Sequence, residues 1–226
     1  VQTGGSTLQA QQPLVNVARV TVQALAAVLG GTQSLHTNGY DEALALPTAA
    51  AATLALRTQQ VVGFESGVSA YADPLAGSVV VEALTDALEA DATRLIEEVD
   101  ALGGAVAAIE AGFYQDRIGA SAYAAQLAIE SGEAVIVGVN RFTTEERFEM
   151  ETKKVPDSIR VTQSERLAAL RQSRDAEAWT SAMDAVETAA RGTGNLMPHL
   201  LRAVEARATV GEISHRLRAG WGEYAG

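Results

Sequence analysis

The stretch that most constrains this chain is GGTQSLHTNGYDE, residues 30–42. One helical pattern ends before it and another begins after it. Residues 34–37 have the length of one short buried strand, Asn38 and Gly39 turn the chain, and the two acids that follow open a helix. A strand, a polar turn and a helix start form the order in which α/β proteins place ligand-binding groups. An ordinary helix–strand–helix connection with polar loop residues explains the same pattern.

Helical spacing predicts one helix before this stretch and one after it. The first covers about residues 13–29, and Gly30 is a natural stop for it. Its apolar face is expected to contain Leu14, Val17, Thr21, Leu25 and Val28. Residues 41–46 form a first helical turn that a proline interrupts, and Thr48 then caps a longer helix that ends near Ser66.

The remainder of the chain is also mainly helical by its pattern. Residues 67–78 have the composition of a linker, and a long helix follows that ends at Gly103 and Gly104. Its apolar stripe contains Val81, Leu84, Leu88, Leu95, Val99 and Leu102. A short Ala-rich helix and a helix over residues 115–131 come next. Residues 134–139 are rich in β-branched side chains and predict a strand.

The C-terminal part predicts polar, poorly periodic chain over residues 143–160 and then three helices. Asp175 and Asn195 are expected to cap helices, and Thr209 and Glu212 have the spacing of a capping box. Trp179 and Trp221 are expected to pack between helices, as is typical of large aromatic side chains.

Composition excludes several classes of function. A formal net charge of −11 argues against nucleic acid and against anionic membranes as partners. The absence of cysteine excludes a disulfide framework and a thiolate metal site. We expect no membrane span and a cytoplasmic location, because no apolar run approaches the necessary ~20 residues and no signal peptide is present. Val1 directly precedes a motif, so we expect the chain to begin inside a longer protein.

Histidines are the remaining candidates for chemistry. His36 lies in the candidate site, but no second histidine or acid follows it at metal-binding spacing, so we expect no metal site here. His199 and His215 lie on predicted helices far along the chain and are expected to be surface or packing residues.

Five blocks resemble the methylmalonyl-CoA mutase family of adenosylcobalamin-dependent acyl-CoA mutases. They are VQTGGSTL at the start, GGTQSLHTNGYDEALALPT, DPLAGS at residues 73–78, VIVGVN at 135–140 and GTGNLMP at 192–198. The blocks occur in the order of the family and cover nearly the whole chain. The resemblance implies the tail of a (β/α)8 TIM barrel in residues 1–70, followed by a helical linker or docking segment in residues 71–226. The fold class is therefore mainly α with a few short strands.

The resemblance also implies a cofactor site. Asn38 and Glu42 match the amide and the acid that hold the adenosyl ribose of adenosylcobalamin, and Gln2 matches a glutamine facing the corrin and adenosyl side. The corrin face would lie over Ala43, Leu46 and Pro47, although simple burial in a helix explains Ala43 and Leu46 nearly as well. Gln33 and Ser34 match positions near the acyl-CoA substrate.

Several family features are absent from this sequence. The Tyr–His pair that polarises the thioester carbonyl lies upstream in the family, and no Asp-x-His-x-x-Gly motif supplies a cobalt ligand. The resemblance thus implies a cobalamin-binding domain or small subunit as partner, in a homo- or hetero-oligomer, with no catalytic residue in this chain itself. We expect the C-terminal portion of a mutase large subunit that rearranges an acyl-CoA. The alternative is a non-catalytic helical interaction module derived from such a mutase.

Overall fold

The computed structural model describes residues 1–145 and 150–224, and within them the chain is almost entirely helix, turn and loop. It divides into two compact units, Val1–Lys154 and Val155–Gly226. The prediction of a mainly α chain is confirmed, whereas the few short strands that were predicted are reduced to isolated bridges within the described residues. Across these described ranges, no helix is both long and apolar enough to cross a membrane.

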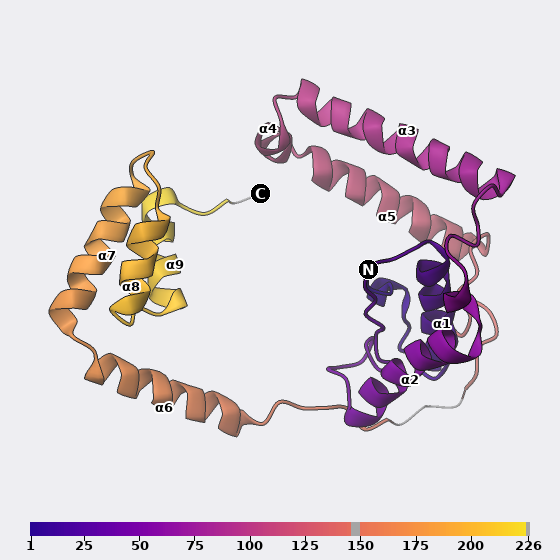
Figure 1. Ribbon diagram of the computed structural model, residues 1–226, viewed down its shortest axis with the longest axis horizontal. Coiled ribbons are helices and arrows are strands. Elements are labelled where there is room, and N and C mark those ends of the chain that lie inside the picture. The colour runs from indigo at the N-terminus through magenta and orange to yellow at the C-terminus, as the bar shows by residue number, and fades with distance from the viewer. Residues whose placement is uncertain (146–149, 225–226) are drawn as a thin grey trace. The chain divides into compact units, whose positions relative to one another are not determined.

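Two helices, α1 (Val15–Leu29) and α2 (Ala49–Glu65), pack side by side in the first unit (Figure 1). The predicted ends are confirmed, since α1 stops at Gly30 and α2 is capped by Thr48, whose Oγ1 accepts a hydrogen bond from the backbone N–H of Ala51. The most buried side chains of the pair are Asn16, Val20, Ala24, Ala51, Ala55, Thr58 and Val62.

The buried face of α1 is not the predicted one. Its most enclosed positions follow one another at four-residue spacing and include an asparagine, Asn16. Most of the predicted stripe is half-buried, and Leu14 is exposed. Apolar spacing located the helix correctly but misjudged its orientation, because Asn16, a polar residue with tertiary hydrogen bonds, lies on the packed face near the start of α1.

Extended chain at the N-terminus runs parallel to the segment before Asn38. The backbone N–H of His36 donates to the carbonyl of Val1 over 2.9 Å, and that of Thr3 donates to the carbonyl of His36 over 3.0 Å. This makes an isolated parallel bridge between Gln2 and His36. The strand expected at residues 34–37 is therefore present only as a single bridge. A pair of extended segments without further strands is only marginally stable.

The chain between Gly39 and Thr48 forms hydrogen-bonded turns and not the predicted helix start. The N–H of Glu42 donates to the carbonyl of Gly39, and the N–H groups of Leu44 and Ala45 donate to the carbonyl of Asp41. Pro47 prevents these turns from continuing into α2 because it has no N–H to donate. The helix proper begins only at Ala49.

The remainder of the first unit is helical. A 3-10 turn, η2 (Val68–Ala70), lies in the predicted linker and precedes α3 (Val79–Ala101), α4 (Ala105–Glu110) and α5 (Phe113–Ser131). An ion pair between Glu98 and Arg117 joins α3 to α5. Neither of these two helices contains a buried residue, so the apolar stripe of α3 is open, with Leu88 70% exposed.

Residues 134–139 do not form the predicted strand. The side chain of Asn140 folds this segment instead, because its Oδ1 accepts from the N–H of Ile136 and its Nδ2 donates to the carbonyls of Ala134 and Ile129. Within the described residues the segment contains only one isolated bridge, between Val137 and Arg141. A β-branched run without a partner strand has no ladder to join, and a local turn satisfies its backbone instead.

Over residues 155–224, the second unit contains four helices where the sequence predicted three: α6 (Asp157–Ser173), α7 (Ala176–Ala190), α8 (Met197–Glu205) and α9 (Val210–Trp221). Met183 and Val186 of α7 and Ala203 of α8 form its core, and Trp179 packs against them. Part of the predicted polar stretch, residues 146–149, lies outside the described residues.

Both predicted caps at α7 and α9 are confirmed in this unit. Asp175 accepts from the N–H groups of Glu177 and Ala178, and Thr209 and Glu212 form a reciprocal capping box. At α8 the cap residue is Leu196, but Asn195 still accepts from the N–H of Met197. Trp221 is 61% exposed and is therefore not core, although its Nε1 donates to the carbonyl of Ala190.

Candidate functional site

The structure brings Gln2 and Asn38 into direct contact. The Nε2 of Gln2 donates a 2.9 Å hydrogen bond to Oδ1 of Asn38. Asn38 is only 2% exposed, its Nδ2 donates to the carbonyl of Thr3, and its N–H donates to Thr3 Oγ1, both over 3.0 Å. The parallel pairing of the two extended segments sets this register. The orientation of the Asn38 amide is consequently fixed by groups from the other segment.

Glu42 lies on the turn after Asn38, close to Gly5. Gly5 belongs to the 3-10 turn η1 (Gly5–Thr7). A methyl group on Gly5 would lie 3.0 Å from Nδ2 of Asn38 and 3.7 Å from both Cγ and Oε1 of Glu42. The absence of a side chain at Gly5 thus leaves a small space bordered by an amide and a carboxylate. Glu42 is exposed, and no hydrogen bond or ion pair of its carboxylate occurs among the described residues.

The other residues implied by the resemblance are exposed or half-buried on the same segments. Ala43 and Leu46 are exposed, with Leu46 53% exposed, and Pro47 is half-buried. Simple helix burial, the alternative explanation for Ala43 and Leu46, is therefore wrong. Gln33 and Ser34 are exposed just before the bridge, and the backbone carbonyl of Ser34 accepts from the N-terminal amine.

Two buried polar residues that sequence reasoning passed over support this site. Asn16 is fully buried and makes four hydrogen bonds. Its Oδ1 accepts from the N–H of Gln9 and from the guanidinium of Arg19, and its Nδ2 donates to the carbonyls of Gln9 and Tyr40. It therefore ties the loop after Gly5 to the turn that carries Glu42. An asparagine inside an otherwise apolar helix pattern was the available signal.

Asp41 is the second such residue. It is 1% exposed, and its Oδ2 accepts hydrogen bonds from both the N–H and the Oγ1 of Thr48, over 2.9 and 3.0 Å. The sequence predicted only that Asp41 and Glu42 open a helix. The turn instead folds this carboxylate inward, toward the N-terminus of α2, where the helix dipole favours negative charge.

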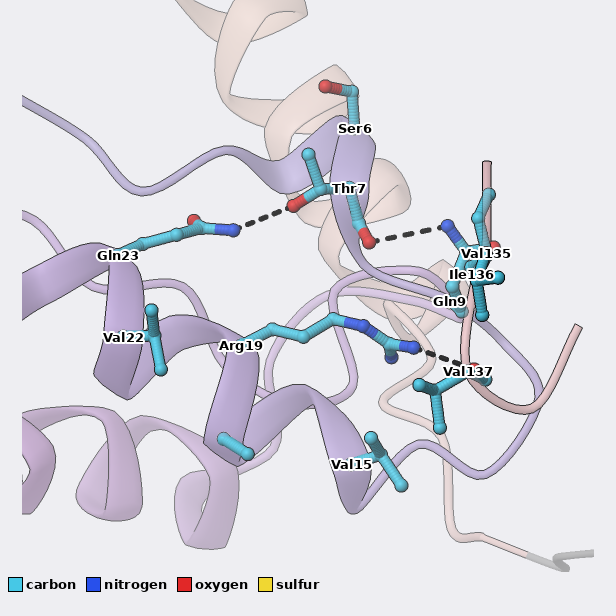
Figure 2. A pocket seen from close by; sticks show the side chains of 11 residues that line it. Ser6, Thr7, Gln9, Val15, Arg19, Val22, Gln23, Val135, Ile136 and Val137 are labelled. Carbon is cyan, nitrogen blue, oxygen red and sulfur yellow. Dashed lines mark hydrogen bonds between the residues drawn. The ribbon is translucent and has the colours of Figure 1, made fainter. Parts of the chain in front are cut away.

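A hollow of about 680 Å³ lies beside this site, between η1, α1 and residues 135–137 (Figure 2). Its polar side chains are engaged with one another across the gap. Arg19 donates to the carbonyl of Val137 over 2.7 Å, and Gln23 donates to Thr7 Oγ1 over 2.8 Å. None of the residues that the resemblance implies for the cofactor or substrate site lines this hollow. The contacts point to a packing seam that holds η1 against α1.

Histidines do not assemble a metal site. Throughout residues 1–145 and 150–224, no group of three or more His, Cys, Asp or Glu side chains is arranged to hold a metal ion. His36 is exposed beside the candidate site, and His199 is half-buried on α8. The side chains that meet at the site are amides and a carboxylate, which can form hydrogen bonds.

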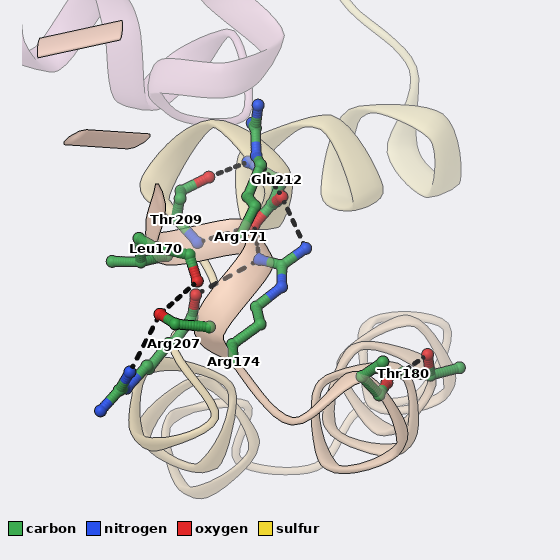
Figure 3. Close-up of polar contacts among 9 residues, drawn as sticks. Leu170, Arg171, Arg174, Thr180, Arg207, Thr209 and Glu212 are labelled. Carbon is green, nitrogen blue, oxygen red and sulfur yellow. Dashed lines mark hydrogen bonds and ion pairs between the residues drawn. The ribbon is translucent and has the colours of Figure 1, made fainter. Parts of the chain in front are cut away.

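The second unit has an electrostatic centre of its own around Glu212 (Figure 3). Arg174 forms two hydrogen bonds to its carboxylate, over 2.8 and 3.0 Å, and lies over the Trp179 ring at 4.1 Å. Arg171 adds a third contact. The hydrogen bond from Arg174, aided by the N–H and hydroxyl of Thr209, lowers the pKa of Glu212 to about 2, against the effect of burial. This network fastens α9 to the end of α6.

Comparison with known proteins places the whole chain in one family. The chain belongs to the methylmalonyl-CoA mutase family, whose model matches residues 1–223. Over 99% of its length it is 44% identical to the methylmalonyl-CoA mutase of Rhizobium meliloti (strain 1021) and 41% identical to that of Escherichia coli (strain K12). It is 43% identical, also over 99%, to the 2-hydroxyisobutanoyl-CoA mutase large subunit of Aquincola tertiaricarbonis.

The chain spans only part of these relatives. It covers 32% of the Rhizobium protein, 31% of the Escherichia protein and 40% of the Aquincola large subunit. The family predicted from sequence is confirmed by these matches, and the chain corresponds to a portion of a mutase.

Proposed function

We propose that this chain is the C-terminal portion of the large subunit of an adenosylcobalamin-dependent acyl-CoA mutase, and that the complete protein rearranges the carbon skeleton of an acyl-CoA. The observation that carries the proposal is the junction of Gln2, Asn38, Glu42 and Gly5, which joins two blocks of the family at one place. The names of the relatives support mutase chemistry.

The extended segments support the finer proposal that residues 1–70 are the tail of a (β/α)8 barrel. Two parallel segments joined by α1, with α2 following, is the order of elements at the end of such a barrel. In this proposal the bridge between Gln2 and His36 belongs to the last two barrel strands. Residues 71–226 are then the helical segment that follows the barrel and links or docks the cobalamin-binding part.

The groups around Gly5 are of the kind that could hold the ribose of an adenosyl group, because an amide and a carboxylate lie on either side of it. A carboxylate accepts hydrogen bonds from two neighbouring hydroxyls, and an amide can both donate and accept. Glu42 provides the carboxylate, whose oxygens accept no hydrogen bond from the described residues. Asn38 provides an amide that Gln2 and Thr3 hold in place. When bound, adenosylcobalamin supplies the radical through its Co–C bond, so the protein contributes positioning more than acid–base chemistry.

The remaining site residues take supporting roles in this proposal. Ala43, Leu46 and Pro47 present a largely apolar surface to the corrin face, and exposed Leu46 is available for such a contact. Gln33 and Ser34 lie toward the acyl-CoA. The carbonyl-polarising residues and the cobalt ligand come from outside this chain. The cobalt ligand belongs to a cobalamin-binding domain or small subunit. The complete protein is a homo- or hetero-oligomer and is cytoplasmic. Which acyl-CoA is rearranged is decided by residues outside the chain.

Glu42→Gln in the full-length protein tests the proposal. Hydrogen bonds to a charged partner contribute roughly 1.5–3 kcal/mol, against about 1 kcal/mol for neutral ones. The assay uses methylmalonyl-CoA or 2-hydroxyisobutanoyl-CoA, whichever the protein turns over. We expect kcat to fall by on the order of tenfold, since ~1.4 kcal/mol corresponds to one decade in rate. The KM for the acyl-CoA should change little.

The matched control is Glu65→Gln. Glu65 is another exposed acid, it ends α2, and its side chain has no hydrogen bond within the described part of the chain. Its kcat should equal that of the unaltered protein. An unchanged kcat for Glu42→Gln at saturating cofactor would remove Glu42 from the site and leave only a weak effect on the stability of the turn.

A further inference from the structure

Asp41 is a buried carboxylate that the proposed chemistry does not use. Both hydrogen bonds to its side chain reach Oδ2, and both come from Thr48. Within the described residues, its Oδ1 is buried and has no hydrogen-bond partner. A buried acceptor without a partner is costly, so an acid at this position requires an explanation beyond solubility or helix propensity.

The turn is built around this side chain. A methyl group on Gly39 would lie 2.7 Å from Oδ1 of Asp41, so only glycine at that position lets the carboxylate fold inward. The carbonyl of Gly39 then accepts a hydrogen bond from the N–H of Glu42 over 3.1 Å. The carbonyl of Asp41 accepts one from the N–H of Leu44 over 2.8 Å. Glu42 is therefore held between two backbone contacts that depend on the packing of Asp41.

Thr48 connects this turn to a rigid element. Its Oγ1 donates to Oδ2 of Asp41 and accepts from the N–H of Ala51 in the first turn of α2. Asp41 is thus linked through one side chain to a seventeen-residue helix. The backbone of this turn sets the position of the Glu42 Cα and the direction in which its side chain leaves the chain, and so determines the region that its carboxylate can reach.

We propose that Asp41 is a positioning residue: by anchoring the turn to Thr48, it holds the Glu42 carboxylate beside Gly5 and Asn38, where it meets the adenosyl ribose. This inference rests on the proposed function. Asp41 does not touch the cofactor and acts only through Glu42. Its substitution should therefore weaken recognition of the adenosyl group without weakening recognition of the corrin.

The test compares two cobalamins that differ in the adenosyl group. In the full-length protein with its cobalamin-binding part, dissociation constants are measured for adenosylcobalamin and for hydroxocobalamin, which lacks adenosine. We expect Asp41→Asn to weaken adenosylcobalamin binding by about tenfold and to leave hydroxocobalamin binding unchanged. Thr48→Val, which loses the hydroxyl, should resemble Asp41→Asn, whereas Thr48→Ser should retain the affinity of the unaltered protein.

A double substitution separates positioning from general stability. If Asp41 acts through Glu42, then Asp41→Asn combined with Glu42→Gln binds adenosylcobalamin no more weakly than Glu42→Gln alone, because residues in one pathway are not additive. Additive losses, or an equal loss for both cobalamins, would show that Asp41 only stabilises the fold. If Asp41→Asn does not fold, Thr48→Val and its combination with Glu42→Gln are judged by the same criteria.

The outcome distinguishes this inference from the proposed function beneath it. If Glu42→Gln leaves the ratio of the two dissociation constants unchanged, the ribose contact itself is wrong. If Glu42→Gln alters the ratio while Asp41→Asn and Thr48→Val do not, the ribose contact stands and the positioning role of Asp41 is wrong.

Discussion

The side-chain amide of Gln2 donates a 2.9 Å hydrogen bond to Oδ1 of Asn38, which lies thirty-six residues later in the chain. The other side of the Asn38 amide is engaged as well, because Nδ2 donates to the carbonyl of Thr3. Rotating the amide by half a turn would break both bonds at once. Gln2 and Thr3 together decide which atom of Asn38 faces the space over Gly5.

Replacing Gln2 with glutamate tests this relationship, since it removes the donor and places a carboxylate against Oδ1 of Asn38. We expect about tenfold weaker binding of adenosylcobalamin by the full-length protein, corresponding to the loss of one hydrogen bond of about 1 kcal/mol plus repulsion between acceptors. Hydroxocobalamin, measured alongside, reports any effect on the corrin side. Unaltered adenosylcobalamin affinity would mean that the orientation of Asn38 does not matter for binding.

Gly5→Ala should fill the space between Asn38 and Glu42. Its new methyl group would lie 3.0 Å from Asn38 Nδ2, which is closer than ordinary contact. We expect adenosylcobalamin binding to weaken by tenfold or more, measured by titration of the full-length protein.

The control for that substitution is Gly63→Ala in α2, where a methyl group meets nothing within 4 Å. Gly63→Ala should leave binding unchanged and increase stability by roughly 0.5–1 kcal/mol, because alanine is favoured over glycine inside a helix. Equal binding by the two alanine variants would contradict the role given to Gly5.

Asn16→Ala should be strongly destabilising for the first unit. It leaves the N–H of half-buried Gln9 and the carbonyl of half-buried Tyr40 without their side-chain partner, and each such loss costs up to about 1–3 kcal/mol. Hydrogen exchange read by mass spectrometry should show faster exchange in α1 and at Gln9. Gln11→Ala, at an exposed neighbouring position, should alter exchange by little. Equal protection in both variants would show that Asn16 does not tie the loop after Gly5 to the turn that carries Glu42.

The stability of the second unit should fall in acid because of Glu212. Its pKa is about 2 in the folded chain and near 4.5 when unfolded. Below pH 4.5 Glu212 is protonated in the unfolded chain but stays ionised in the folded chain. The stabilisation is therefore complete above pH 4.5 and is lost as pH falls toward 2. The full difference amounts to at most about 3 kcal/mol at 1.36 kcal/mol per pKa unit.

Tryptophan fluorescence isolates this effect, because Trp179 and Trp221 are the chain's two tryptophans and both lie in the second unit. Urea unfolding followed at this signal should give a free energy of unfolding that falls between pH 4.5 and 2. In Glu212→Gln the value should be lower at neutral pH and fall less in acid. Parallel pH curves for the two proteins would show that Arg174 and Glu212 contribute nothing.

Local sequence determined several of the helix ends. The stop of α1 at Gly30, the cap of α2 at Thr48, the cap of α7 at Asp175 and the capping box at Thr209 were all predicted and observed. Each depends on hydrogen bonds between residues at most four positions apart. Such interactions are encoded by neighbouring residue types and need no knowledge of the remaining chain.

Tertiary structure decided which polar groups from separate segments of the chain meet. Neither the hydrogen bond between Gln2 and Asn38 nor the inward fold of Asp41 follows from residue spacing. The predicted strand at residues 134–139 failed for the same reason: a strand requires a partner from elsewhere, and without one Asn140 closed the segment into a turn. Burial of a polar side chain is favourable only where a distant partner satisfies it, and the packing of α1, α2 and the two extended segments supplies those partners.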